Sequence, residues 1–276
     1  MKVPGKEIMQ GRSLKIAVVG GTGRVGHHIV EVLKSGGHDV VPMSRSTGVD
    51  VITGNGLAKA LEGVECVIDA TTGPSPEQEA ATEFFVTATR NLQESGKRAG
   101  VKRIVVVSII GIDRFTTGYS AAKQAHEKAM LSGPIPVRIL RAAQFHEFVD
   151  TLVGWGRKGD VSYLPKMRTQ LVAARTVAKA LADLATDSAP ITATSNAQIP
   201  EIAGPKEENL VDAARRLVTR RGDSLRIESV SNPADPATAL YESGALLPSP
   251  NATLAGPTFD EWLEATIPAK RRAQAV

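Results

Sequence analysis

The sequence is poor in cysteine and in aromatic residues. Its 276 residues include one cysteine, Cys66, which excludes a disulfide within the chain. The five histidines show no metal-ligand spacing with Cys66, so we predict no metal site. Aromatic residues make up only 4% of the chain, which indicates a core built from valine, isoleucine, leucine and alanine.

Long apolar runs and a strong charge bias are absent as well. No segment approaches the ~20 apolar residues needed to cross a bilayer. The first residues, MKVPGKEIMQGRS, contain no apolar stretch typical of a secretion signal. The formal net charge is +4, and basic pairs such as Arg215-Arg216 are not interleaved with aromatic residues. We therefore expect a cytoplasmic protein with no membrane or nucleic-acid partner.

The sequence does have a regular alternation of strand-like and helix-like segments up to Gln144. Short runs rich in β-branched residues alternate there with amphipathic segments. The predicted strands span 14–19, 39–43, 49–52, 65–70, 102–110 and 137–140; the predicted helices span 25–35, 57–61, 77–99 and 119–131. Such alternation is typical of an α/β fold of the Rossmann type, a doubly wound parallel sheet with helices on both faces.

A glycine-rich segment directly follows the first predicted strand and opens a helix. It reads GGTGRVG and has the spacing GxxGxxG. Glycine permits a tight turn and lets the backbone approach a pyrophosphate, while the helix N-terminus offers unpaired N–H groups. The sequence therefore predicts a dinucleotide phosphate site, and its expected cofactor-binding residues are Gly20, Thr22, Gly23, Arg24, Val25 and Gly26.

The end of the second predicted strand bears on the choice of cofactor. An acidic residue there would bind the ribose 2′-hydroxyl of NAD, but the stretch is Ser44-Arg45-Ser46. Arg45 can pair bidentately with a 2′-phosphate, and both serines can donate to it. We therefore predict NADP (as NADPH) in preference to NAD, although Asp50 remains an alternative contact for the adenosine.

Beyond Gln144 the alternation weakens, which points to a second part of the chain. The segments 176–184 and 207–218 have helical patterns, 199–203 and 225–230 have strand patterns, and a terminal helix is expected near Phe259. We expect three parts: a flexible N-terminal leader at 1–12, an NAD(P)-binding core at 13–144, and a small C-terminal substrate-binding annex at 145–276, interleaved with the last elements of the core.

A tyrosine and a lysine four residues apart indicate proton-transfer chemistry. Tyr119 and Lys123 share one face of a predicted helix. Reduction of a carbonyl needs an acid near the developing alkoxide, and a nearby ammonium lowers the pKa of a tyrosine toward that role. Ser108 is expected at the carboxyl end of the preceding strand, where its hydroxyl can polarise a carbonyl, although simple solvation or a backbone hydrogen bond explains it equally well. The expected catalytic residues are thus Tyr119, Lys123 and Ser108, and Lys123 is also expected to bind the nicotinamide ribose.

These motifs together resemble the short-chain dehydrogenase/reductase superfamily, in particular its atypical NmrA-like branch. The matching segments are GGTGRVG at 20–26, Arg45, DATTG at 69–73, VSIIGID at 107–113, YSAAKQAHEKAM at 119–130 and RILRAAQFHEF at 138–148. The resemblance implies that Ala70, Thr71 and Thr72 lie beside the cofactor. It also implies that residues 138–148 form the sixth strand and the loop over the nicotinamide, although Ala142 and Ile109 stand where the family often has proline and serine.

That branch contains both enzymes and regulators, so the sequence leaves three functions open. The first is an NADPH-dependent reductase of a small carbonyl compound or quinone, with Gln144, Phe145 and His146 near the substrate. The second is a non-catalytic NADP-sensing regulator that binds a partner protein. The third is a sugar-nucleotide epimerase or dehydratase. An intact Tyr119–Lys123 pair favours the reductase, as a monomer or homodimer.

Overall fold

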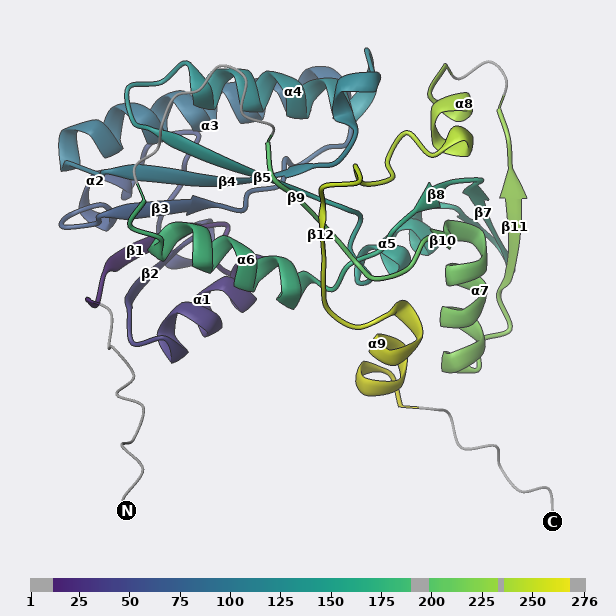
Figure 1. Ribbon diagram of the computed structural model, residues 1–276. Helices are drawn as coiled ribbons and strands as arrows, with labels where there is room; N and C mark the ends of the chain where they lie inside the picture. The colour runs from purple at the N-terminus through teal and green to yellow at the C-terminus, as the bar shows by residue number, and fades with distance from the viewer. Residues whose placement is uncertain (1–11, 190–198, 233–235, 269–276) are drawn as a thin grey trace, which may run out of the picture.

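The computed structural model describes residues 12–189, 199–232 and 236–268, and it has the expected α/β fold. Seven parallel strands form the central sheet, in the order β12-β9-β5-β4-β3-β1-β2 (Figure 1). Their bounds are β1 Lys15–Val19, β2 Asp39–Met43, β3 Cys66–Asp69, β4 Arg103–Ile109, β5 Val137–Ala142, β9 Glu201–Ala203 and β12 Thr253–Leu254. Because the strands are parallel, the carboxyl ends of β1, β3, β4 and β5 meet at one edge of the sheet.

Helices cover both faces of this sheet. α1 (Gly26–Ser35) and α6 (Ala174–Thr186) lie on one face, and α3 (Gln78–Ala99) and α4 (Gly118–Leu131) lie together on the other, with the short α2 (Leu57–Ala60) (Figure 1). Two short 3₁₀ helices, η1 (Arg45–Thr47) and η2 (Ile112–Arg114), follow β2 and β4. Buried valine, isoleucine and leucine side chains fill both interfaces, as the shortage of aromatic residues predicted.

The strand predicted at 49–52 is wrong, and its neighbour β2 is an edge strand. Residues 51–53 form a turn, and the Asp50 carboxylate accepts a hydrogen bond from the Ile52 N–H at 2.8 Å. An aspartate side chain that bonds backbone two residues ahead favours a turn over a strand. Because β2 pairs only with β1, the missing N–H of Pro42 leaves no ladder bond unmade.

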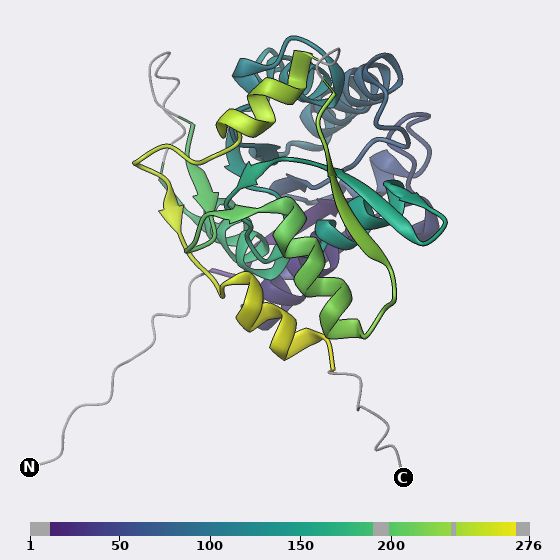
Figure 2. The same cartoon turned by 90° about the vertical axis from the view of Figure 1, so that its right-hand side faces the viewer.

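The C-terminal part adds a second hydrophobic cluster beside the sheet. It contains α5 (Phe148–Trp155), α7 (Leu210–Arg221), α8 (Pro236–Ser243) and α9 (Phe259–Thr266), with a three-stranded sheet in the order β11-β7-β6 and a two-stranded sheet of β10 and β8 (Figure 2). These strands are β6 Arg157–Lys158, β7 Val161–Pro165, β8 Arg168–Thr169, β10 Glu208–Asn209 and β11 Arg226–Val230. Since α6, β9 and β12 return to the central layers, the annex and the core interleave in sequence.

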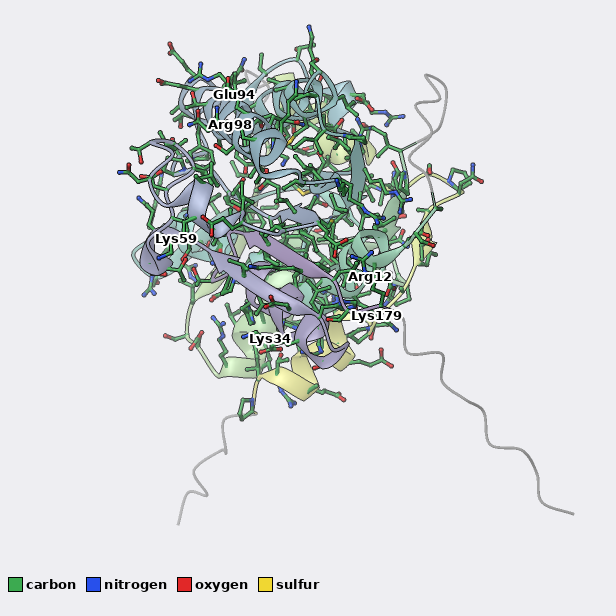
Figure 3. All side chains as sticks on the ribbon, turned by 90° about the vertical axis from the view of Figure 1, so that its left-hand side faces the viewer. Arg12, Lys34, Lys59, Glu94, Arg98 and Lys179 are labelled. Atoms are coloured by element: carbon green, nitrogen blue, oxygen red, sulfur yellow. The ribbon has the colours of Figure 1, made fainter. Side chains whose placement is uncertain are left out.

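Charged side chains of both signs spread over the helical surface. Figure 3 labels Arg12, Lys34, Lys59, Glu94, Arg98 and Lys179, which come from widely separated parts of the sequence. Arg12 pairs with Glu65 at 3.0 Å, and Arg98 donates to the Ser95 hydroxyl at 3.1 Å. Among the described residues, no helix is both long and apolar enough to cross a membrane.

Candidate functional site

The glycine-rich loop lies where the sequence placed it, between the end of β1 and the start of α1. Gly20 adopts a left-handed backbone (φ +74°), which glycine tolerates best. The N–H groups of Gly20 and Gly21 donate to the Met43 carbonyl at 2.9 and 3.2 Å, which fixes the loop beside the end of β2. The turn closes through the Gly23 N–H, which donates to the Gly20 carbonyl at 2.8 Å.

Two close backbone approaches explain why the loop requires glycine. A Cβ on Gly26 would lie 2.0 Å from the Gly20 carbonyl oxygen, and a Cβ on Gly20 would lie 2.7 Å from the Ala70 carbonyl oxygen. The loop therefore sits directly against both the start of α1 and the end of β3. Thr22, Gly23 and Arg24 are exposed, whereas Val25 and Gly26 are buried. Val25, at the N-cap of α1, supplies no side-chain acceptor to the helix N-terminus. The His27 and Ile29 N–H groups donate to the Gly23 and Val25 carbonyls, both at 3.0 Å, so the remaining N–H groups of the first turn are the ones that suit a pyrophosphate.

Ser44, Arg45 and Ser46 follow β2 beside this loop. Arg45 is exposed and forms no ion pair with any residue that the structure describes. The hydroxyls of Ser44 and Ser46 lie 2.8 Å apart and hydrogen-bond to each other. The three side chains thus cluster at the edge of the sheet, and the guanidinium of Arg45 is available for an anion.

The segment after β3 forms the next wall of the same edge. The Ala70 N–H donates to the Val19 carbonyl at 3.0 Å, which continues the pairing of β3 with β1. The Thr71 N–H donates to the Asp69 carboxylate at 2.9 Å, and Thr72 is exposed. Within the described part of the chain, the buried Thr71 hydroxyl has no hydrogen-bond partner. Ala70 and Thr71 therefore lie next to the glycine loop, and Thr72 follows them. That the three residues lie beside a cofactor stays a prediction.

Tyr119 lies in the first turn of α4, mostly buried, with its ring edge-on to Phe85 of α3 at 5.9 Å between centroids. Burial raises the pKa of its hydroxyl to about 12, against the opposing effect of the Gly73 N–H. This corrects the sequence expectation that Lys123 lowers the Tyr119 pKa. The Lys123 ammonium bonds to other groups instead, and the Tyr119 hydroxyl is protonated at neutral pH.

Lys123 is almost fully buried, at 4% exposure, and its ammonium has two partners. It donates to the Val107 carbonyl at 3.0 Å and to His126 Nδ1 at 2.9 Å, and it lies 4.7 Å from the centre of the Phe85 ring. Burial lowers the pKa of Lys123 to about 8, although the charges of Asp69 and Glu127 oppose that shift.

Two residues that the sequence analysis did not select complete this polar cluster. His126 Nε2 contacts the Asp69 carboxylate at 3.1 Å, and Phe85 stacks on the His126 ring at 4.5 Å. Asp69 ends an otherwise apolar strand, and His126 stands three residues after Lys123 on the same helix. Each position carried a weak signal, because a charged residue in a buried strand needs a partner. Their contact across the fold was not visible in the sequence.

Ser108 lies near the carboxyl end of β4, as predicted, but it is 3% exposed. Side chains alternate along a strand, so Ser108 faces the α3–α4 layer together with Val106. Its hydroxyl is buried and bonds to no described residue. The serine therefore lies on the same side of the sheet as Lys123, and the expected catalytic contact stays a prediction.

The three residues proposed for the substrate follow β5 and separate into two groups. Gln144 and Phe145 are partly exposed; Gln144 accepts a hydrogen bond from the Thr169 hydroxyl at 2.5 Å. His146 is 1% exposed, contacts Phe259 and Trp262 of α9, and donates through Nε2 to the Pro257 carbonyl at 3.1 Å. Burial lowers the pKa of His146 to about 4. In this geometry His146 joins α9 to the core.

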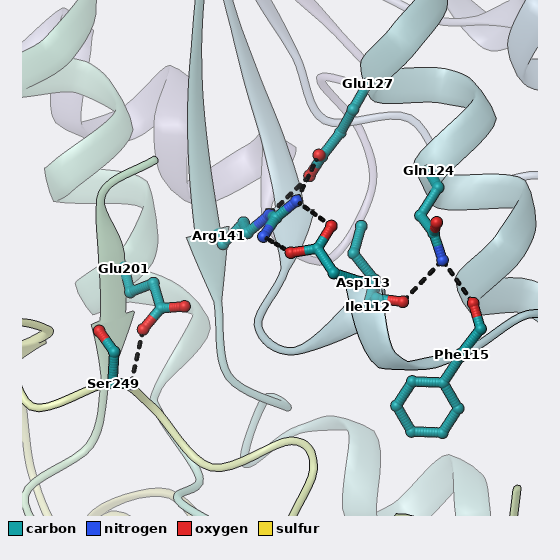
Figure 4. A network of polar contacts seen from close by, with 8 residues as sticks. All are labelled: Ile112, Asp113, Phe115, Gln124, Glu127, Arg141, Glu201 and Ser249. Atoms are coloured by element: carbon teal, nitrogen blue, oxygen red, sulfur yellow. Dashed lines mark hydrogen bonds and ion pairs between the residues drawn. The ribbon is translucent and has the colours of Figure 1, made fainter. Parts of the chain in front are cut away.

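A network centred on Arg141 of β5 holds the connection between β4 and α4 (Figure 4). Arg141 donates to both carboxylate oxygens of Glu127, at 3.0 and 2.7 Å, and pairs bidentately with Asp113. Gln124 donates to the Ile112 and Phe115 carbonyls, both at 2.6 Å. These contacts fix the segment that leads to Tyr119.

Among the described residues, one group of potential metal ligands lies next to the glycine loop. His27, His28 and Glu31 of α1 bring their ligand atoms within 4.8 Å of one another. Glu31 already pairs with the Arg175 guanidinium at 2.9 Å, and His27 Nδ1 bonds to the Gly23 carbonyl at 2.8 Å. Both contacts compete with a cation, and we assign no metal there.

Comparison with known proteins identifies the family of the nucleotide-binding part. A family model described as NAD(P)H-binding matches residues 20–188, more than half of the chain. The Photosystem II assembly factor Ycf39 of Synechocystis sp. is 29% identical over 147 residues, which are 48% of this chain and 45% of that protein. The chain therefore spans less than half the length of this curated relative.

Solved structures share the fold at low sequence identity. A short-chain dehydrogenase/reductase superfamily protein from Agrobacterium tumefaciens with bound NAD has a TM-score of 0.63 at 18% identity, covering 91% of this chain and 95% of that one. The UDP-N-acetylglucosamine 4-epimerase of Bacillus cereus has a TM-score of 0.62 at 19% identity, covering 92% and 95%. An NADPH-dependent quinone oxidoreductase of Escherichia coli has a TM-score of 0.51 at 20% identity, covering 83% and 82%. The expected resemblance is thus confirmed for the nucleotide-binding part and for the fold.

Proposed function

The chain belongs to the NAD(P)H-binding family, and from that premise we propose that it is an NADPH-dependent reductase of a small carbonyl compound or a quinone. One observation carries the proposal. Tyr119 and Lys123 lie on the face of α4 that meets the carboxyl ends of β3 and β4, through Gly73 and the Val107 carbonyl. The glycine loop lies at this same edge, because the strands are parallel.

The residues present suit the two ends of a dinucleotide. The loop at 20–26 and the start of α1 would hold the pyrophosphate, and Ala70, Thr71 and Thr72 would lie beside the adenosine. When bound, the nicotinamide supplies a hydride to the substrate. Lys123 has three N–H donors and two internal partners, so one donor remains for a hydroxyl group at the sheet edge.

Tyr119 suits the reductive direction. A carbonyl that accepts a hydride becomes an alkoxide, which is a strong base and takes a proton from a nearby acid. Since burial raises the Tyr119 pKa to about 12, the phenol is protonated at neutral pH and ready to donate. Gln144 and Phe145 follow β5 on the same side and would border the substrate.

The preference for NADPH is supported by the chemistry after β2. The exposed guanidinium of Arg45, with the Ser44 and Ser46 hydroxyls, offers a cation and hydrogen bonds to a 2′-phosphate. No carboxylate stands in that stretch to bind the 2′-hydroxyl of NAD.

The test is oxidation of NADPH, followed at 340 nm, with a panel of quinones, aldehydes and ketones. UDP-sugars are tested separately by chromatography of the sugar products, because one solved relative is named a UDP-N-acetylglucosamine 4-epimerase and an epimerase causes no net oxidation of NADPH. We expect Tyr119→Phe to lower kcat on an active substrate by roughly 100-fold or more, because a positioned acid contributes about that much. The matched control is Tyr163→Phe on β7, outside the site. Full turnover by Tyr119→Phe would contradict the role of Tyr119.

A non-catalytic NADP-binding regulator is the second candidate, and one observation favours it. Lys123 is hydrogen-bonded to His126 and to the Val107 carbonyl, and Tyr119 is mostly buried. Both side chains therefore already contact other parts of the protein, as residues with a purely structural role would. The named relative is an assembly factor. This candidate predicts tight NADPH binding with no oxidation of NADPH by any member of the panel.

A further inference from the structure

A buried polar chain joins β3, α4 and β4 behind the candidate site. Asp69 ends β3, His126 and Lys123 lie on α4, and the Val107 carbonyl belongs to β4. The successive contacts are 3.1 Å from Asp69 to His126, 2.9 Å from His126 to Lys123, and 3.0 Å from Lys123 to Val107. All three side chains are at least 95% buried, so water does not separate these contacts.

The hydrogen-bond chemistry fixes where each proton lies. A lysine ammonium only donates, so Nδ1 of His126 must accept from Lys123 and carries no proton. The proton of the neutral ring is then on Nε2, which donates to the Asp69 carboxylate. Asp69 is held ionised by this bond and by the Thr71 N–H, and His126 keeps its pKa lowered from 6.5 through burial and the Lys123 charge.

The charged groups around the imidazole come from two elements. Asp69 from β3 and Glu127 from α4 favour a proton on His126, whereas Lys123 from α4 opposes it. Glu127 is neutralised in part by its two bonds to Arg141. From α3, the aromatic ring of Phe85 stacks on His126 and covers Lys123. The pKa of His126 is therefore lowered mainly by burial and by the nearest charge, that of Lys123.

We propose that His126, oriented by Asp69, is a positioning residue that holds the Lys123 ammonium for the bound nucleotide and releases it in acid. A proton on Nδ1 would face the ammonium across 2.9 Å, where the neutral nitrogen now accepts a bond. Two like charges at that distance in a buried site repel strongly, so Lys123 must move or lose its proton. His126 is thus an acid-sensitive latch on Lys123.

The functional consequence rests on the proposed function. If the third donor of Lys123 binds the nucleotide, release of Lys123 weakens nucleotide binding. The sign follows from the direction of the His126 pKa. Since that pKa lies below 6.5, the latch is closed at neutral pH and opens as the pH falls below 6.5.

The first test reads the protonation state in the nucleotide-free protein. Nitrogen-15 NMR of the His126 imidazole distinguishes the two neutral tautomers and the protonated ring. We expect the Nε2–H tautomer at pH 7 and protonation only below pH 6.5. An Nδ1–H tautomer, or a protonated ring at pH 7, would overturn the proposal. This measurement needs neither substrate nor turnover, so failure of the proposed reductase activity leaves it intact.

The second test measures the dissociation constant of NADPH between pH 5 and pH 8. Gln at position 126 can accept from Lys123 and donate to Asp69 but does not titrate, so His126→Gln is the conservative variant. We expect the wild-type affinity to fall by about 10-fold or more on acidification, the His126→Gln affinity to change by less than about 3-fold, and His126→Leu to bind weakly at every pH. His38→Gln is the matched control, because His38 stands just before β2, at the amino-terminal end of the strands, and its Nδ1 accepts from the Leu14 N–H.

One confounding titration is removed by repeating the series with NADH. The 2′-phosphate of NADPH itself gains a proton near pH 6, and NADH lacks that phosphate. The same acid dependence in His126→Gln as in the wild type, with either nucleotide, would rule the latch out. If His126→Leu does not fold, His126→Gln and the NMR measurement still decide.

Discussion

The two ends of the candidate site are built in different ways. At the glycine-loop end, backbone hydrogen bonds fix the structure: the N–H groups of Gly20 and Gly21 donate to the Met43 carbonyl. The side chains of Thr22, Arg24 and Arg45 are exposed there. At the Tyr119 end, buried side chains from several elements bond to one another. The side chains at the first end are exposed, whereas most polar groups at the second end already have partners inside the protein.

This difference shows how the two ends respond to change. A backbone cradle depends on the absence of side chains, so any added atom disturbs it locally. A buried polar cluster depends on every member, because removing one leaves another without a partner. Loss of the loop should therefore affect binding first, and loss of the cluster should affect stability as well.

Phe85→Ala should give the largest effect, at the Tyr119 end. Phe85 is fully buried, stacks on His126 and contacts Tyr119 and Lys123, so its loss leaves a cavity beside a buried charge. We expect a loss of about 3 to 5 kcal/mol in the free energy of unfolding, measured with urea. Val86→Ala is the control, because Val86 is exposed on the same helix and should change stability by less than about 0.5 kcal/mol.

Gly26→Ala should disrupt the glycine loop at the other end of the site and weaken nucleotide binding. The new Cβ would stand 2.0 Å from the Gly20 carbonyl oxygen, so the loop must shift. We expect NADPH affinity to fall by about 100-fold or more, which corresponds to about 2.7 kcal/mol, measured by titration calorimetry. In Gly154→Ala the Cβ meets nothing within 4 Å, and that variant should bind normally. Equal binding by both variants would remove the loop from the site.

The third prediction concerns His146, which the sequence analysis assigned to the substrate and which packs against α9 in the structure. Its pKa of about 4 lies below the value of 6.5 in the unfolded chain. The unfolded state therefore binds a proton first as the pH falls, and stability should decrease between pH 6.5 and pH 4, by up to about 3 kcal/mol. His146→Gln, which keeps a donor for Pro257, should flatten this part of the stability profile measured by thermal unfolding. An unchanged slope would assign the acid sensitivity to other groups.

Arg45→Glu should give the smallest effect, confined to nucleotide preference. A carboxylate would repel the 2′-phosphate and can accept from a 2′-hydroxyl, so the ratio of NADPH to NADH affinity should fall by about 10- to 100-fold. Arg24→Glu is the comparison within the loop, and it should weaken both nucleotides together. A preference for NADH in the wild type would contradict the role of Arg45.

The outline of the fold could be predicted from the sequence with one clear error. β1, α1, α3, β4 and α4 lie within one or two residues of their predicted bounds. The strand at 49–52 was wrong, because Asp50 caps a turn that hydrophobic pattern alone does not reveal. The short strands β6, β7, β8 and β10 were not predicted, since two to five residues carry too little periodicity.

The sequence by itself determined the glycine loop and the spacing of Tyr119 and Lys123. Both are local: a turn that only glycine allows, and two side chains one helical turn apart. Only the tertiary structure decided that Lys123 bonds to His126, that His126 bonds to Asp69, and that His146 packs under α9. Such contacts join residues far apart in the sequence, such as His126 with Asp69 and His146 with Trp262, and no local pattern encodes which buried polar groups will meet.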